Sequence, residues 1–191
     1  GSRPMPGSRP AAPQASSLQA TLSEISALLE RAPQDALRRS EALLRDRPGL
    51  PPAELLACQA LRRTGQPRAA LARLGVLARQ HPRTPAVIWE MAQAAVDLGD
   101  ARQAVRLLEA LTQLQPMVAD GWFLLAGQLR KAGRDQDARR ADLSGVHAAS
   151  HDPDLLKAAL AMNEGRLDEA QTFVAARLQR AAQDPAAFRL L

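Results

Sequence analysis

The chain has 191 residues, 46% of them hydrophobic, which suffices for one ordinary domain or a short repeat array and excludes a wholly disordered chain. Aromatic residues make up only 3% and Tyr is absent, while Ala, Leu, Arg and Gln dominate, so the composition favours an all-α protein over a β-sandwich or barrel. The net charge is +5, and 20 acidic residues are interspersed among 25 basic ones, which disfavours a dedicated nucleic-acid surface.

Residues 1–17 are rich in Gly, Ser, Pro, Ala and Arg, and the string Gly-Ser-Arg-Pro occurs twice. Such a segment buries too little apolar surface to offset its ordering entropy, so we expect a disordered tail or tag. It also lacks the apolar core of a secretory signal, and no apolar run in the chain approaches the ~18 residues of a membrane span. We therefore expect a cytoplasmic protein without a membrane partner.

From Leu18 onward the apolar residues recur with a helical period, and three residue types repeat every 34 residues. They are the prolines Pro48, Pro82 and Pro116, the alanines Ala36, Ala70, Ala104 and Ala138, and the glycines Gly65, Gly99 and Gly133. Self-similarity at this period is typical of stacked repeats. We predict five helix-turn-helix units, over residues 17–50, 51–84, 85–118, 119–152 and 153–186. In each, Gly closes the first helix, Ala allows close approach of the second, and Pro stops the second.

This pattern resembles the tetratricopeptide repeat (TPR), whose units read W-x2-L-G-x2-Y, then A-x3-F, then P. The fourth unit matches with Trp122, Leu125, Ala126, Leu129, Gly133 and Ala138. The resemblance spans roughly residues 18–186 and implies an all-α solenoid of about five TPR units in a right-handed superhelix. Two departures mark its ends: Arg31 replaces the glycine of the first unit, and Gly165 comes two residues early in the fifth, which predicts a short first helix there.

The sequence pattern near the C-terminus predicts that the repeat array continues beyond the residues present. Residues 187–191 read as the opening of a further, truncated repeat, and we expect this open end to support self-association. The run from Trp122 to Leu191 also resembles the repeat region of bacterial TPR-sulfotransferase proteins. That resemblance implies a catalytic domain, C-terminal to the repeats, that uses a phosphoadenosine phosphosulfate donor and is absent from this chain.

Few residues suggest chemistry, and we predict no catalytic residue, no cofactor and no metal. His147 and His151 have the i, i+4 spacing of a metal pair, but no third ligand is evident and Ser150 and Pro153 predict that the helix ends between them. Two exposed turn histidines are therefore the favoured interpretation. Cys58 occupies a slot for a small packed residue, so a buried inert thiol is favoured over a nucleophile.

One face of the first helices is a candidate peptide-binding groove. In the TPR fold, the position after the first packing residue turns toward the concave side, and Leu55, Trp89 and Phe123 occupy it. Farther along the same face come polar and charged residues, namely Gln59, Gln93, Arg62, Arg63, Asp97, Arg130 and Lys131. An apolar strip beside a basic one suits an extended or helical peptide. For Trp89, core packing is the alternative interpretation.

Three functions are compatible with this sequence. The leading hypothesis is a non-catalytic module that binds a protein or peptide, with acidic character because residues 51–84 hold six arginines against Glu54 alone. The second is the substrate-docking arm of a larger enzyme, with a sulfotransferase suggested by the second resemblance. The third, nucleic-acid binding through Arg62, Arg63, Arg73, Arg79 and Arg83, is disfavoured because these residues are split between two helices and a turn.

Overall fold

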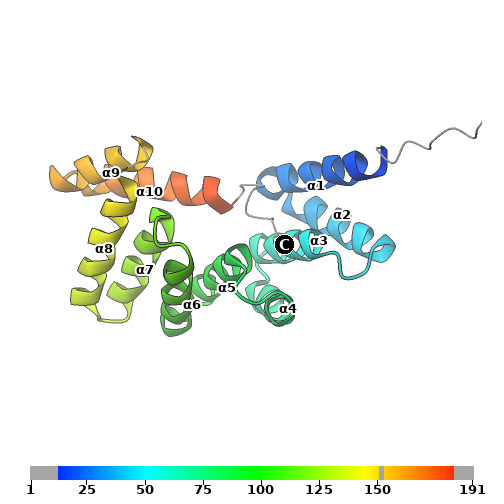
Figure 1. The fold of residues 1–191 in the computed structure, drawn as a ribbon, viewed down its shortest axis with the longest axis horizontal. Coiled ribbons are helices and arrows are strands. Elements are labelled where there is room, and N and C mark those ends of the chain that lie inside the picture. The colour runs from blue at the N-terminus through cyan, green and yellow to red at the C-terminus, as the bar shows by residue number, and fades with distance from the viewer. Residues whose placement is uncertain (1–12, 151–152, 183–191) are drawn as a thin grey trace, which may run out of the picture.

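In the computed structural model, residues 13–150 and 153–182 are described, and they form ten α-helices and no strand. The helices follow one another as five hairpins (Figure 1). Their bounds are α1 (Pro13–Arg31), α2 (Pro33–Asp46), α3 (Pro51–Arg63), α4 (Pro67–Gln80), α5 (Pro85–Asp97), α6 (Ala101–Leu114), α7 (Ala119–Lys131), α8 (Asp135–Ala149), α9 (Pro153–Asn163) and α10 (Leu167–Ala182). The predicted all-α fold class is confirmed.

The first helix starts earlier than the sequence analysis predicts. Helix α1 begins at Pro13, so residues 13–17, which were expected to belong to a disordered tail, are helical. Proline suits the first helical position because its φ is already helical and its missing N–H would be unpaired there anyway. Residues 1–12 of the predicted tail lie outside the described residues, as do residues 187–191 of the predicted further repeat.

Prolines set most helix boundaries. Helices α2, α3, α4 and α5 each begin on a proline, and α2, α4 and α6 each end two residues before Pro48, Pro82 or Pro116. The pyrrolidine ring fits a first helical turn but lacks the N–H that would continue the preceding helix, and the residue before it avoids the helical region. The predicted role of the phased prolines as helix breakers is confirmed.

The phased glycines turn the chain inside each hairpin. Gly65, Gly99 and Gly133 have φ values of 81°, 72° and 76°, in the left-handed region that residues with a Cβ avoid. In the fifth unit Gly165 takes this role, and α9 is shortened to 11 residues, as predicted. Where Arg31 replaces the glycine, α1 runs through Arg31 and only Ala32 separates it from α2.

The core is distributed along the array instead of being gathered at one centre. The phased alanines of the first four second helices are fully buried, so each of these helices has a small side chain at the same point of its packed face: Ala36, Ala70, Ala104 and Ala138. The largest cluster joins helices α5 to α8 and contains Ala92, Val105, Leu108, Leu111, Leu125, Ala126, Leu129, Ala138 and Ala141. Successive units therefore bury one another's apolar faces, as in a solenoid.

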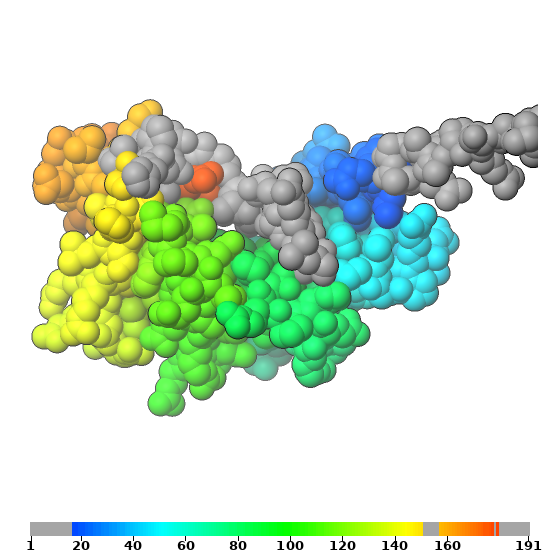
Figure 2. All heavy atoms as spheres, in the orientation of Figure 1, coloured from blue at the N-terminus to red at the C-terminus, as the bar shows by residue number. Residues whose placement is uncertain are grey.

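The hairpins follow an arc whose two ends lie on the same side of the molecule (Figure 1). Helix α1 stands at one end and the α9–α10 pair at the other, with α5 to α7 between them, as the space-filling view shows (Figure 2). Helix α10 turns back along this side toward α1, and it packs on α7 as well as on α9. None of the described helices is both long and apolar enough to cross a membrane.

Candidate functional site

The concave side of the arc contains a hollow of about 560 Å³. Helices α1, α3, α5 and α7 each contribute side chains to it, and α10 faces them from the other side. We call this space the inner hollow; its lining consists of Leu29, Glu30, Pro33, Arg62, Arg63, Gln93, Leu124, Ala175 and Gln179. Residues that are far apart in the sequence meet here because the arc brings equivalent faces of successive units together and α10 then returns across them.

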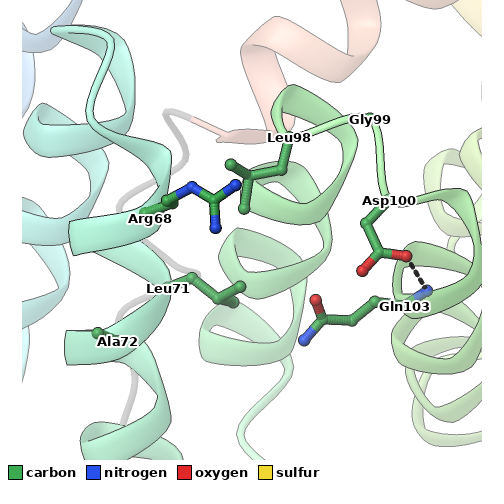
Figure 3. A pocket seen from close by; sticks show the side chains of 7 residues that line it. All are labelled: Arg68, Leu71, Ala72, Leu98, Gly99, Asp100 and Gln103. Atoms are coloured by element: carbon green, nitrogen blue, oxygen red, sulfur yellow. Dashed lines mark hydrogen bonds between the residues drawn. The ribbon is translucent and has the colours of Figure 1, made fainter.

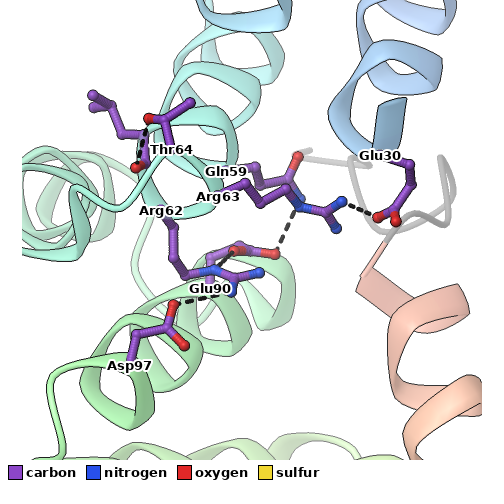
Figure 4. A network of polar contacts seen from close by, with 8 residues as sticks. Glu30, Gln59, Arg62, Arg63, Thr64, Glu90 and Asp97 are labelled. Atoms are coloured by element: carbon purple, nitrogen blue, oxygen red, sulfur yellow. Dashed lines mark hydrogen bonds and ion pairs between the residues drawn. The ribbon is translucent and has the colours of Figure 1, made fainter. Parts of the chain in front are cut away.

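A polar network forms one wall of the inner hollow (Figure 4). Glu90 of α5 is only 1% exposed, and Gln59 of α3 donates a hydrogen bond from Nε2 to its Oε1 at 3.1 Å. Arg62 donates from Nε to Glu90 Oε2 at 3.2 Å and from Nη1 to Asp97 Oδ2 at 3.1 Å. Burial by itself favours the neutral guanidine, but Glu90 and Asp97 outweigh it and raise the pKa of Arg62. The network thus clamps α3 to α5 and holds a permanent positive charge between two carboxylates.

The predicted basic strip of the second unit is largely neutralised by neighbouring units. Arg62 is bound as described above, Arg63 forms an ion pair with Glu30 of α1, and Arg73 pairs with Glu41 of α2 and Glu54 of α3. Three of the six arginines of residues 51–84 thus form ion pairs within the chain. Counting the charges of the second unit alone could not predict this pairing, because most of the acidic partners belong to the adjacent units.

The second predicted basic pair also differs from expectation. Arg130 is exposed but forms an ion pair with Asp142 of α8. Burial raises the pKa of the Asp142 carboxyl above its ordinary value, while Arg130 acts in the opposite direction. Lys131 is exposed at the end of α7. Neither residue lines the inner hollow.

Two residues predicted to line the groove belong to the core instead. Leu55 is fully buried and packs with Leu74 and Val87, between α4 and α5. Phe123 is 7% exposed and packs with Ala148, Ala149 and Val174, so it lies under α8 and α10. The sequence shows which side of its helix each residue occupies but not which other helices cover that side, so it predicts an open surface for both.

Trp89 is intermediate between the two interpretations that the sequence allows. Its side chain is half-buried and packs against the cluster around Ala92 and Leu125. The indole Nε1 is shielded from solvent and has no hydrogen-bond partner among the described residues. Of the predicted groove residues, the inner hollow brings together Arg62, Arg63 and Gln93, whereas Gln59 and Asp97 hold the network behind it.

Several residues of the site were missed by the sequence analysis. Glu90 could have been found from the sequence, because its single charge interrupts the apolar run from Val87 to Ala92. Nothing in the sequence marks Glu30 or Leu124 as site residues, because their positions in the repeat pattern are ordinary surface positions. The sequence also did not indicate that α10 lines the hollow, because a regularly repeating solenoid would not bring a second helix onto the concave side.

A second hollow, of about 710 Å³, lies between α4 and α6 (Figure 3). We call it the outer hollow; its lining consists of Arg68, Leu71, Ala72, Leu98, Gly99, Asp100 and Gln103. Asp100 is engaged in local structure, because its Oδ1 accepts a hydrogen bond from the backbone N of Gln103 at 3.0 Å and caps α6. Of the motifs identified in the sequence, only the helix-closing glycine, Gly99, borders this hollow.

The thiol of Cys58 and the histidine pair were the two candidates for chemistry in the sequence. Burial raises the pKa of the Cys58 thiol to about 12, so it is protonated at neutral pH and is a poor nucleophile. Helix α8 ends at Ala149 with Ser150 as its cap, which confirms that the helix stops before His151, a residue outside the described part. Within the described part, no group of three or more His, Cys, Asp or Glu side chains is placed to hold a metal ion.

The helix hairpins, the phased residues and the core distributed along the array together define an α-solenoid with the fold of tetratricopeptide-repeat proteins. A thermophilic TPR protein of Thermus thermophilus, TTC0263, has a similar fold, with a TM-score of 0.64 and 22% identity over 90% of this chain and 94% of that one. MamA from Desulfovibrio magneticus RS-1 is also similar, with a TM-score of 0.63 and 18% identity over 91% of this chain and 100% of that one. No protein-family model and no curated protein sequence matches the chain.

Proposed function

We propose that this TPR solenoid is a non-catalytic protein-interaction module that binds a segment of a partner protein in the inner hollow. The observation that carries the proposal is the convergence of four first helices, α1, α3, α5 and α7, on one concave space. Its lining combines apolar side chains, such as Leu29 and Leu124, with the amides of Gln93 and Gln179 and with charged groups. Concave sites of this mixed character suit a peptide, because apolar contacts supply affinity and a few polar groups set orientation.

The charge of the hollow bears on what the partner can be. Because Arg62 is already held by Glu90 and Asp97, it has little capacity to attract an acidic peptide. Arg63 pairs with Glu30, which is itself 41% exposed, so an acidic residue of a partner would compete with Glu30 for this guanidinium. We therefore propose that one acidic residue near Arg63 tunes the binding, while apolar contact provides most of the affinity.

A peptide library selected on the immobilised protein supplies a ligand, and two matched variants test where it binds. Gln93→Arg places a long charged side chain in the inner hollow, and Gln103→Arg places the same side chain in the outer hollow. For a ligand of micromolar affinity, about −8 kcal/mol, we expect Gln93→Arg to weaken binding at least about tenfold in calorimetric titration. Gln103→Arg should bind as the wild type does. Loss of binding in Gln103→Arg alone would assign the ligand to the outer hollow and contradict the proposal.

Trp89 is not a suitable probe of this site. Because its indole packs against the core cluster of α5 to α8, Trp89→Ala should lower the free energy of unfolding by about 2–3 kcal/mol. Any loss of ligand binding would then reflect folding as much as contact.

The other two functions have less support from the described residues. A substrate-docking arm of a larger enzyme would use the same hollow, so it remains a compatible role and the sulfotransferase resemblance remains a prediction. Nucleic-acid binding would need free cations, whereas three of the five arginines considered for it, Arg62, Arg63 and Arg73, are engaged in ion pairs within the chain.

A further inference from the structure

Helix α10 is placed differently from the other second helices of the array. In the preceding units each second helix packs on the first helix of the next unit, as α4 does on α5 and α6 on α7. Helix α10 packs back on α7, the first helix of the preceding unit, and α9 is docked on α8 less extensively than α7 is on α6. The fifth hairpin is therefore turned so that its second helix lies over the concave side (Figure 1).

The contacts of α10 show what the concave side accepts. Val174 joins the apolar cluster around Phe123, while Ala175 and Gln179, one helical turn apart, line the inner hollow. The ring of Phe123 also lies against α8, where it occupies the space left by the missing Cβ of Gly145. A Cβ added there would lie 2.8 Å from Phe123 Cε1. The platform is thus built by α7 and α8, and α10 rests on it.

Few of the side chains of helix α10 that the structure describes are buried. Of its described side chains only Ala170 is buried, and Val174 is half-buried, whereas Leu167 is 59% and Phe173 38% exposed. By comparison, α6 buries Ala104, Val105, Leu108, Leu111 and Thr112. Segments with few buried apolar contacts open at a low free energy, well below that of global unfolding. Helix α10 is therefore the described second helix that is most easily lifted from the array.

We propose that α10 is a displaceable occupant of the concave side and that the partner of this protein is an amphipathic helix that takes its place against Phe123. This inference rests on the proposed function, because it identifies the occupant of the same hollow. The partner helix presents a narrow face of small and medium-sized apolar residues one turn apart, with a hydrogen-bonding amide beside it, as Val174, Ala175 and Gln179 do in α10. The hollow that remains beside α10 is lined by residues of six helices, α1, α2, α3, α5, α7 and α10.

The displacement has a measurable consequence. Suppose that a ligand binds only when α10 is lifted. Its apparent dissociation constant then equals the intrinsic one divided by the fraction of molecules that are open, so a small open fraction weakens the apparent binding. An attached helix competes at a high effective concentration, so releasing it exposes the intrinsic affinity of the site. A substitution that weakens the docking of α10 should thus strengthen the binding of a helix supplied in solution.

A fluorescent synthetic peptide of the α10 sequence, residues 167–182, serves as the probe, and its binding to the full chain is followed by anisotropy. Val174→Asp places a carboxylate against Phe123 and should release α10, whereas the adjacent Phe173→Asp adds the same charge on an exposed position. We expect the Val174→Asp chain to bind the peptide at least about tenfold more tightly than the wild type, and Phe173→Asp to bind as the wild type does. Equal binding by the wild type and Val174→Asp overturns the inference.

Hydrogen exchange shows whether Val174→Asp acts locally. The amides of α10 should exchange at least about tenfold faster in this variant than in the wild type, with no change in α3 to α6. Equal acceleration in all helices would mean that α10 opens only with global unfolding, and the inference would fail. If a library ligand binds the inner hollow equally in the wild type and in Val174→Asp, the inference fails but the interaction module stands. If neither the library nor the peptide yields a ligand for any variant, both fail.

Discussion

Glu90 is a buried carboxylate whose charge is compensated by Arg62, the one described cation at ion-pair distance from it. Burying a carboxylate is costly unless it is paired and hydrogen-bonded, and Glu90 meets both conditions through Arg62 and Gln59. The free energy of this arrangement depends on both partners being present, because removal of one leaves the other as a buried, partly uncompensated charge.

Glu90→Gln should therefore lower the free energy of unfolding by about 2–3 kcal/mol in urea denaturation. The variant keeps one oxygen, which can accept the hydrogen bond of Gln59, but its NH2 group then faces the Arg62 Nε–H, so the measurement reports the loss of the charge together with one hydrogen bond. Asp97→Asn is the control, because Asp97 is 36% exposed and its ion pair with Arg62 is screened by water, so its loss should cost less than about 1 kcal/mol. Equal losses of unfolding free energy in the two variants would show that the burial of Glu90 does not determine how much its ion pair contributes to stability.

Cys58 makes stability depend on alkaline pH. Its pKa is raised from 9.0 to about 12, chiefly by burial, so the folded state keeps a proton that the unfolded state releases above pH 9.0. Stability from this group is complete below pH 9.0 and is lost as the pH rises toward 12. Relative to Cys58→Ala, the wild type should lose stability as the pH is raised through this window. The thiol should also resist alkylation at neutral pH until urea unfolds the chain; rapid alkylation of the native protein would contradict its burial.

Helix packing depends on the phased alanines, which are fully buried in four of the second helices. Ala104→Leu adds a branched side chain where α6 has no free space, and overpacking of this kind should cost about 1–3 kcal/mol. Ala110 lies on the exposed side of the same helix, and Ala110→Leu should change the melting temperature little. Because both substitutions conserve helix propensity, a similar effect of the two would mean that packing of α6 is not the cause.

Two glycines inside helices should respond oppositely to the same substitution. Gly145 in α8 faces the ring of Phe123, and a Cβ there would lie within 3.0 Å of three ring atoms, so Gly145→Ala should displace the ring and destabilise the fold. Gly127 in α7 has no atom within 4 Å of an added Cβ, so Gly127→Ala should stabilise by about 0.5–1 kcal/mol through backbone entropy. Thermal unfolding of the two variants measures both. A gain in Gly145→Ala would show that Phe123 is not seated on α8.

At the scale of the whole molecule, several of the described exposed apolar side chains belong to the last three helices, α8 to α10. Leu160 and Leu167 are 58% and 59% exposed, and Leu143 of α8 is 70% exposed. Exposed apolar clusters promote association, so we expect the average mass in sedimentation to rise with concentration. Leu160→Lys combined with Leu167→Lys should reduce this effect, whereas Val76→Lys, at a 46% exposed position of α4, should not. A mass independent of concentration in the wild type would contradict the expectation.

The helices, their order and their ends could be predicted from the sequence, because each is decided by local chemistry. Pro48, Pro82 and Pro116 cannot continue a helix, and Gly65, Gly99 and Gly133 turn left-handed where a Cβ would be strained. The burial of Ala104 and its equivalents follows from the same phase, because a repeat places equivalent residues in equivalent environments. The start of α1 differed, because Pro13 begins a helix within a segment whose composition is typical of a tail.

The candidate site was decided by tertiary structure. Whether Leu55 and Phe123 reach the surface depends on the helices that lie over them, and the charge of Arg62 and Arg63 depends on acidic residues one repeat away. The return of α10 across the concave side depends on how the fifth hairpin is turned relative to the fourth. The sequence by itself determined the repeat and its local turns, because these need only the conformational preferences of neighbouring residues. The shape and charge of the hollow arise from contacts between units, and those exist only once the solenoid has coiled.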